Sequence, residues 1–151
     1  MIEQAAQRSR ELFESGYYCA ESVVLAIAER QGLQSNLLPR IATGFCSGLA
    51  RTCGMCGAVS GAIMGLGLAT GRTAPTESVT QNYVLVRKLL DTFEVRYGTT
   101  NCQELLGCDL GTAEGQQIFR ANELVERCKR FTEEATQIAM SLIADANTEK
   151  P

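Results

Sequence analysis

Three cysteines lie within eleven residues in the stretch "FCSGLARTCGMCG", and their type and spacing can do chemistry. Cys53 and Cys56 form a C-x-x-C pair, and Cys46 precedes them in a C-x6-C spacing. Thiols in this arrangement can converge on one metal centre. The glycines among them let the backbone wrap around such a centre, and the positive charge of Arg51 favours thiolates. We therefore predict Cys46, Cys53 and Cys56 as metal ligands supplied by one loop.

The same C-x-x-C pair allows a second chemistry. We expect a helix to begin at Cys56, and the N-terminus of a helix stabilises a thiolate and makes it nucleophilic. Cys53 or Cys56 could then attack a disulfide while its neighbour resolves the mixed disulfide, which would make these two residues catalytic. The βαβ context that usually accompanies a thioredoxin-like C-x-x-C is not predicted here.

The chain contains seven cysteines and no histidine, which narrows the kinds of site that it can build. The absence of histidine excludes Cys-His zinc sites and Cys-His catalytic pairs. It also excludes haem ligation by histidine and the C-x-x-C-H haem attachment signal. Thiolate-rich ligation favours an iron–sulfur cluster or zinc, and we expect no haem. A fourth ligand, and further cofactor contacts, can come from the remaining cysteines, which are Cys19, Cys102, Cys108 and Cys128.

Periodicity and helix-stop signals predict a single all-α domain, a bundle of about six to seven helices over residues 1–146 with a frayed tail at 147–151. Residues 46–55 are expected to be a loop. Thr100 with Gln103 forms a predicted capping box for a short helix that Gly107 ends. The main helices are expected at 2–14, 18–31, 35–45, 56–70, 76–97 and 122–146.

Three glycines recur every fourth residue in the predicted helix 56–70. Gly57, Gly61 and Gly65 therefore share one face, although each costs about 1 kcal/mol relative to alanine in a helix interior. We expect another backbone, or a cofactor, to approach this face closely. The apolar stripe of the helix 76–97 and this glycine face together predict a symmetric homodimer.

Composition limits the partners and the compartment. With 151 residues, a net charge of −3 and a pI near 5.1, the chain is not expected to bind nucleic acid or an anionic membrane. Its longest apolar run, residues 58–69, is too short for a membrane span of about 20 residues. The first residues carry no signal-peptide pattern, so we expect a cytoplasmic protein in which clustered cysteines serve metal or redox chemistry.

The chain resembles the family of proteins named after its cysteine pattern, C-GCAxxG-C-C, whose members are described as redox-active. Four blocks carry the resemblance in order: "GYYCAESVVLA", "CGAVSGAIMGLGLATG", "NCQELLGCDL" and the segment around Cys128. Cys46 and Cys53 look like additions found in a subset of that family. The family is also similar to a module of split-Soret cytochromes, whose haem-binding segments this chain lacks.

Three functions follow as hypotheses. The first is an iron–sulfur electron-transfer protein that works with an unidentified redox partner protein. The second is a thiol–disulfide oxidoreductase that uses Cys53 and Cys56. The third is a structural zinc site in a helical interaction module. Whether the chain is an enzyme depends on which of the three holds.

Overall fold

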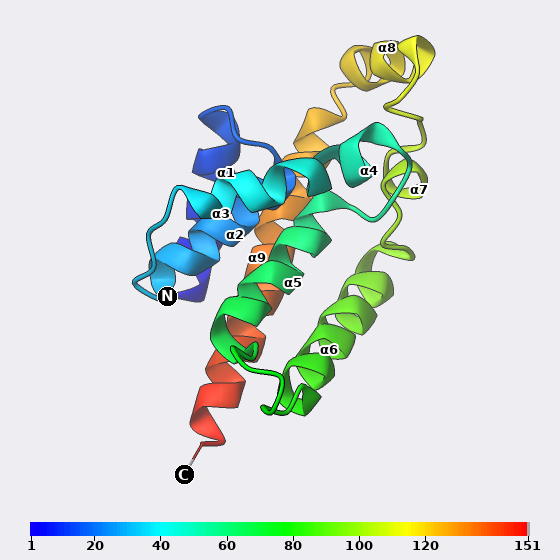
Figure 1. Ribbon diagram of the computed structural model, residues 1–151. Coiled ribbons are helices and arrows are strands. Elements are labelled where there is room, and N and C mark those ends of the chain that lie inside the picture. Colours follow the sequence, from blue (N-terminus) through cyan, green and yellow to red (C-terminus); the bar gives the residue numbers. More distant parts are fainter. Residues whose placement is uncertain (151) are drawn as a thin grey trace.

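The structure is a computed structural model that describes residues 1–150, and it is helical almost throughout (Figure 1). The elements are α1 (Ile2–Glu14), α2 (Cys19–Arg30), α3 (Leu37–Ala42), the 3₁₀ turn η1 (Thr43–Phe45), α4 (Cys46–Arg51), α5 (Gly57–Thr70), α6 (Thr80–Tyr97), α7 (Cys102–Leu106), α8 (Ala113–Ala121) and α9 (Val125–Thr148). The predicted all-α class is confirmed. Apart from α4, which is left-handed, residues 1–150 form eight α-helices, so the predicted six to seven was too few.

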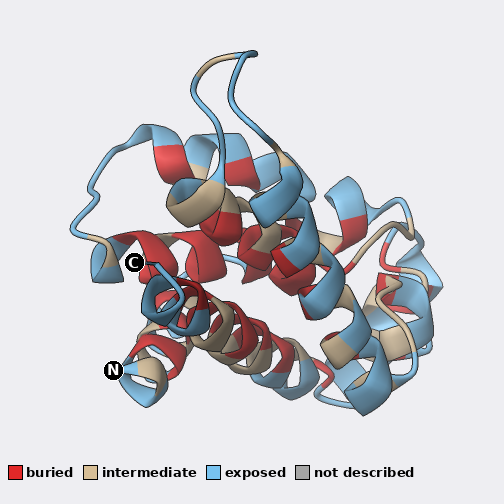
Figure 2. Ribbon diagram, turned by 90° about the horizontal axis from the view of Figure 1, so that it is seen from below, coloured by how far each residue is buried: buried red, intermediate tan, exposed pale blue. Residues whose placement is uncertain are grey.

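The long helix α9 is the centre of the bundle. It packs against α1, α2, α5 and α6, while α7 lies beside its N-terminal end, near α4, and α8 lies beyond that end (Figure 1). Buried positions lie where the helices face one another, and exposed positions lie on the outside (Figure 2). Fully buried side chains such as Ile27, Leu66 and Phe93 form this core. No helix within residues 1–150 is long and apolar enough to cross a membrane.

Helix α5 is enclosed by α2, α6 and α9, and for this reason it is apolar on nearly every side. Gly57, Gly61 and Gly65 share one face, as their four-residue spacing predicts, and this face meets α2. A Cβ at Gly61 would lie 2.6 Å from the backbone oxygen and 3.0 Å from the Cα of Ala20. A Cβ at Gly65 would overlap the side chain of Ile27. The predicted close approach of another backbone is therefore confirmed at Gly61, and that backbone belongs to α2.

A pair of glycine substitutions in α5 tests this packing. Gly61→Ala is expected to lower the free energy of unfolding by roughly 1–3 kcal/mol, because the backbone of α2 must move away. Gly67→Ala is the control, since a Cβ at Gly67 would meet nothing within 4 Å. It should raise stability by up to about 1 kcal/mol through helix propensity. Equal urea midpoints for the two variants would contradict the close approach.

Several helix boundaries differ from the predicted ones. Helix α6 begins at Thr80 rather than near residue 76, and α9 runs from Val125 to Thr148, so it extends into the predicted tail 147–151. Pro151 lies outside the described residues. The predicted loop 46–55 contains α4, whose conformation is part of the site described next.

Candidate functional site

Residues 47–51 form one turn of left-handed helix, which we call the left-handed turn. The φ angles are 57° at Ser47, 64° at Gly48, 58° at Leu49, 55° at Ala50 and 66° at Arg51. Each residue other than glycine costs roughly 1–2 kcal/mol in this conformation. Such strain persists only where the surrounding structure enforces it, and it is concentrated at functional sites.

Gly48 allows the left-handed turn to pack directly against Cys102. A Cβ at Gly48 would lie 2.5 Å from Cys102 Cβ and 3.1 Å from its Sγ. The backbone oxygen of Gly48 also accepts hydrogen bonds from the N–H groups of Gly54, at 2.9 Å, and Thr52, at 3.3 Å. The turn is thereby closed on itself and held against the start of α7.

Two backbone hydrogen bonds join the segment before α5 to the segment before α7. The N–H of Cys56 donates to the Thr100 oxygen at 2.7 Å, and the N–H of Cys102 donates to the Gly54 oxygen at 2.9 Å. Cys56 is the N-cap of α5, and Cys102 is the first residue of α7. This pairing brings together two cysteines that lie far apart in the sequence.

Asn101 fixes this pairing, and the sequence analysis missed it. Its side-chain N–H donates to the Cys53 oxygen at 2.7 Å, while its Oδ1 accepts from the Glu104 N–H at 3.1 Å and caps α7. The predicted cap was Thr100, one residue earlier. Asparagine is a favoured N-cap, so its position before the predicted short helix was the available signal.

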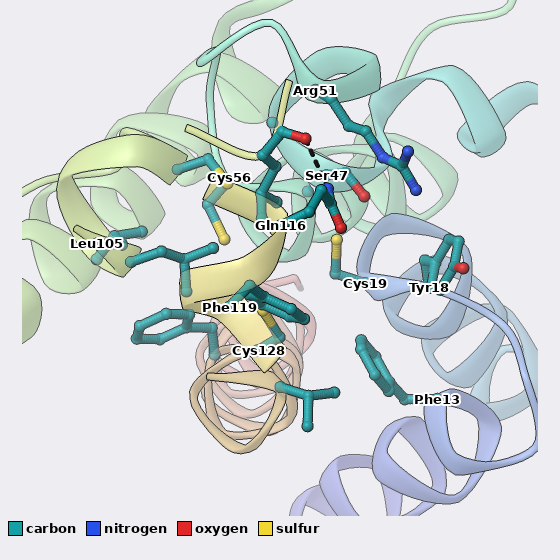
Figure 3. Close-up of a pocket in the computed structure, with 17 residues that line it drawn as sticks. Phe13, Tyr18, Cys19, Ser47, Arg51, Cys56, Leu105, Gln116, Phe119 and Cys128 are labelled. Atoms are coloured by element: carbon teal, nitrogen blue, oxygen red, sulfur yellow. Dashed lines mark hydrogen bonds between the residues drawn. The ribbon is translucent and has the colours of Figure 1, made fainter. Parts of the chain in front are cut away.

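Four cysteine side chains line one cavity of about 150 Å³ (Figure 3). Cys19 begins α2, Cys56 and Cys102 begin α5 and α7 as described above, and Cys128 lies in α9. Most of the remaining lining is aromatic or aliphatic and comes from α1, α7, α8 and α9 and from the chain between them. Arg51 is the only Arg, Lys, Asp or Glu residue in the lining. The cavity is therefore a largely apolar chamber into which thiols from four elements are brought.

The thiols of this chamber are difficult to ionise. Burial raises the pKa of Cys56 and of Cys102 to about 11, and that of Cys128 to about 12. Neighbouring cysteines contribute to the rise at all three positions. Backbone hydrogen bonds in the first turn of α5 lower the pKa of Cys56, but burial outweighs them. Metal binding here must therefore displace thiol protons.

These raised pKa values predict a pH-dependent stability for the reduced, metal-free protein. An ordinary thiol titrates near about 8.5, so as the pH rises the unfolded chain loses its thiol protons before the folded chain does. The free energy of unfolding should be highest below about pH 8.5 and fall by on the order of 3 kcal/mol for each of the three thiols by about pH 11. Urea denaturation across this range measures it. A Cys128→Ala variant should show a shallower fall, and an equally steep one would contradict the assignment.

The other three cysteines lie outside the lining. Cys46 is buried beside Cys19. Cys53 is half-buried, and its backbone has a φ of 60°. The neighbouring Asp109 raises the pKa of the Cys53 thiol. Cys108 is buried, and its thiol lies near enough to raise the pKa of Cys102.

Of the three ligands predicted from the loop, only Cys56 therefore lines the cavity. Its companions there, Cys19, Cys102 and Cys128, were expected only as further candidates. Across residues 1–150, no three Cys, Asp or Glu side chains are grouped tightly enough to hold a single metal ion.

Fold and site together define a small all-helical protein with clustered thiols. A family model described as "Putative redox-active protein (C_GCAxxG_C_C)" matches residues 17–142, a span that contains all seven cysteines. The chain belongs to this family, and the resemblance drawn from its cysteine and glycine blocks is confirmed. No curated protein and no solved structure matches the chain.

Proposed function

We propose that this protein is an electron carrier that holds an iron–sulfur cluster in the cavity, with Cys19, Cys56, Cys102 and Cys128 as its four ligands. The observation that carries the proposal is the convergence of these thiols, from four elements, on one chamber of about 150 Å³. When bound, such a cluster supplies reversible one-electron chemistry, and it is commonly held by four cysteine thiolates.

The chemistry of the chamber fits this group. Four thiols line it, its other side-chain donors are the oxygens of Tyr18, Ser47 and Gln116, and the chain has no histidine that could compete. The apolar lining limits the access of water, and burial is one of the factors that set cluster potentials. Arg51 is the one charged residue of the lining, and its positive charge complements an anionic cluster.

The spread of the thiols favours a cluster over one zinc ion. A structural zinc site needs four donors, each about 2.3 Å from a common centre if they are sulfurs. The cysteines around the chamber are not grouped that tightly. A cluster of several irons occupies more space, so its ligands stand further apart than those of one ion.

The surroundings of Cys53 and Cys56 disfavour the oxidoreductase hypothesis. A catalytic thiol is activated by a lowered pKa. Here Asp109 raises the pKa of Cys53, and burial raises that of Cys56. Neither thiol therefore has the lowered pKa that repeated catalytic turnover requires, so electron transfer is the better-supported function.

Iron and sulfide analysis tests the proposal. The full chain is purified without oxygen and reconstituted with ferrous iron and sulfide. We expect coloured protein that retains iron and sulfide through desalting, with a visible absorption that dithionite bleaches and reoxidation restores. Colourless protein without iron would overturn the proposal, and stoichiometric zinc without a redox response would replace it with the structural zinc site.

A further inference from the structure

Cys46 and Cys19 form a buried pair at one side of the cavity. Cys19 raises the pKa of the Cys46 thiol more than any other group does, which places the two side chains close together. The Cys46 thiol also lies 3.7 Å from the Oε1 of Glu21 and 3.7 Å from the backbone oxygen of Ala42, which can accept its proton in a hydrogen bond. These contacts hold the Cys46 thiol beside Cys19.

The geometry around Gly57 supports this pairing independently. A Cβ at Gly57 would overlap Cys19 Sγ and would lie 3.1 Å from Cys46 Cα and 3.0 Å from the Phe45 oxygen. The sulfur of Cys19 and the backbone of Cys46 therefore approach the same point at the start of α5. Glycine at position 57 leaves the space that lets them meet.

We propose that Cys19 and Cys46 are a dithiol pair that a low-molecular-weight disulfide oxidises to a Cys19–Cys46 disulfide. Cys19 lines the cavity (Figure 3) and Cys46 does not, and from this we infer that an incoming disulfide meets Cys19 first. A chamber of about 150 Å³ admits a small reagent and excludes a folded protein. The substrate class is therefore a small organic disulfide.

The reaction is two successive thiol–disulfide exchanges. The sulfur of Cys19 attacks the small disulfide, its S–S bond breaks, and the first small thiol leaves with the proton of Cys19. The sulfur of Cys46 then attacks the mixed disulfide at Cys19, and the second small thiol leaves with the proton of Cys46. The pair loses two electrons, and the reagent gains two electrons and two protons.

This reaction also controls the metal site, a consequence that rests on the proposed function. Oxidation removes Cys19 from the four proposed ligands, so the oxidised protein should take up little iron. A cluster bound through Cys19 should in turn protect the pair. Either effect makes cluster loading depend on the redox state of the small-thiol pool.

Peptide mapping of the reduced, metal-free protein tests the pair. The protein is incubated with 2-hydroxyethyl disulfide, free thiols are alkylated, and the chain is cut with trypsin. Cleavage leaves Cys19 alone in the peptide 11–30 and Cys46 alone in the peptide 41–51. We expect these two peptides to be recovered as one cross-linked species, with the other cysteines mainly alkylated.

Variants separate this result from general oxidation. Cys46→Ser should stop the reaction at a mixed disulfide on Cys19, while Cys53→Ser should leave the cross-link unchanged. Recovery of both peptides in alkylated form, or of Cys19 cross-linked mainly to another cysteine, would overturn the proposal. The assay contains no metal, so a protein that binds no iron could still form this disulfide, and the two proposals can fail separately.

Discussion

Replacing Cys56 with serine is expected to lower the iron bound after reconstitution by roughly tenfold or more, since loss of a ligand exceeds the effect of outer-shell changes. Cys56 stands at the start of α5, is paired through its backbone with Thr100, and borders the chamber. Serine keeps the size of the side chain and is a favoured N-cap residue, so the fold should survive. Iron analysis together with circular dichroism measures both properties.

Cys53→Ser is the matched control, because Cys53 belongs to the same C-x-x-C pair but lies outside the cavity lining. It should retain nearly all of the iron. An equal loss in both variants would favour the ligand set predicted from the loop, Cys46, Cys53 and Cys56, over the set that lines the cavity.

Gly48→Ala is expected to lower the free energy of unfolding by roughly 2–4 kcal/mol, which combines backbone strain with overpacking. The backbone at Gly48 has φ of 64°, and an added Cβ would lie 2.5 Å from Cys102 Cβ. Both Gly48 and Cys102 are held by main-chain hydrogen bonds and cannot move apart freely. Urea denaturation of the reduced, metal-free protein measures the loss.

The control is Ala50→Gly, which replaces alanine by glycine in the same left-handed turn. Ala50 has φ of 55° and an exposed side chain, so Ala50→Gly relieves strain and removes little packing. A gain of a few tenths to about 1 kcal/mol is expected after the entropy cost of glycine. A stable Gly48→Ala protein, or a strongly destabilised Ala50→Gly protein, would show that the left-handed turn does not position Cys102.

The helices were predictable because their signals are local. Glycines at 98 and 107 end α6 and α7 in left-handed conformations, and the spacing of Gly57, Gly61 and Gly65 predicts the close contact that α2 makes. The left-handed turn was not predictable, since only one of its five residues is a glycine. Its conformation depends on the packing of Cys102 and on hydrogen bonds to Gly54, which are tertiary contacts.

The candidate site was predictable only in part for a related reason. The C-x-x-C spacing indicated Cys56, but spacing says nothing about Cys19 or Cys128, which reach the cavity through the packing of α2 and α9. Closeness in the sequence is also an unreliable guide to which thiols share a site, as Cys46 shows. It is close to Cys56 in the sequence, yet in the fold its thiol lies against Cys19.

The distribution of the cavity cysteines along the chain has a consequence for how the protein matures. Cys19 and Cys128 enclose most of the chain, so no shorter segment carries all four thiols, and each chain closure that joins them costs entropy. The chamber therefore exists only after α2, α5, α7 and α9 have docked. Under the proposed function, iron delivered to a partly folded chain would find scattered thiols, so cluster insertion would be a late step that follows folding.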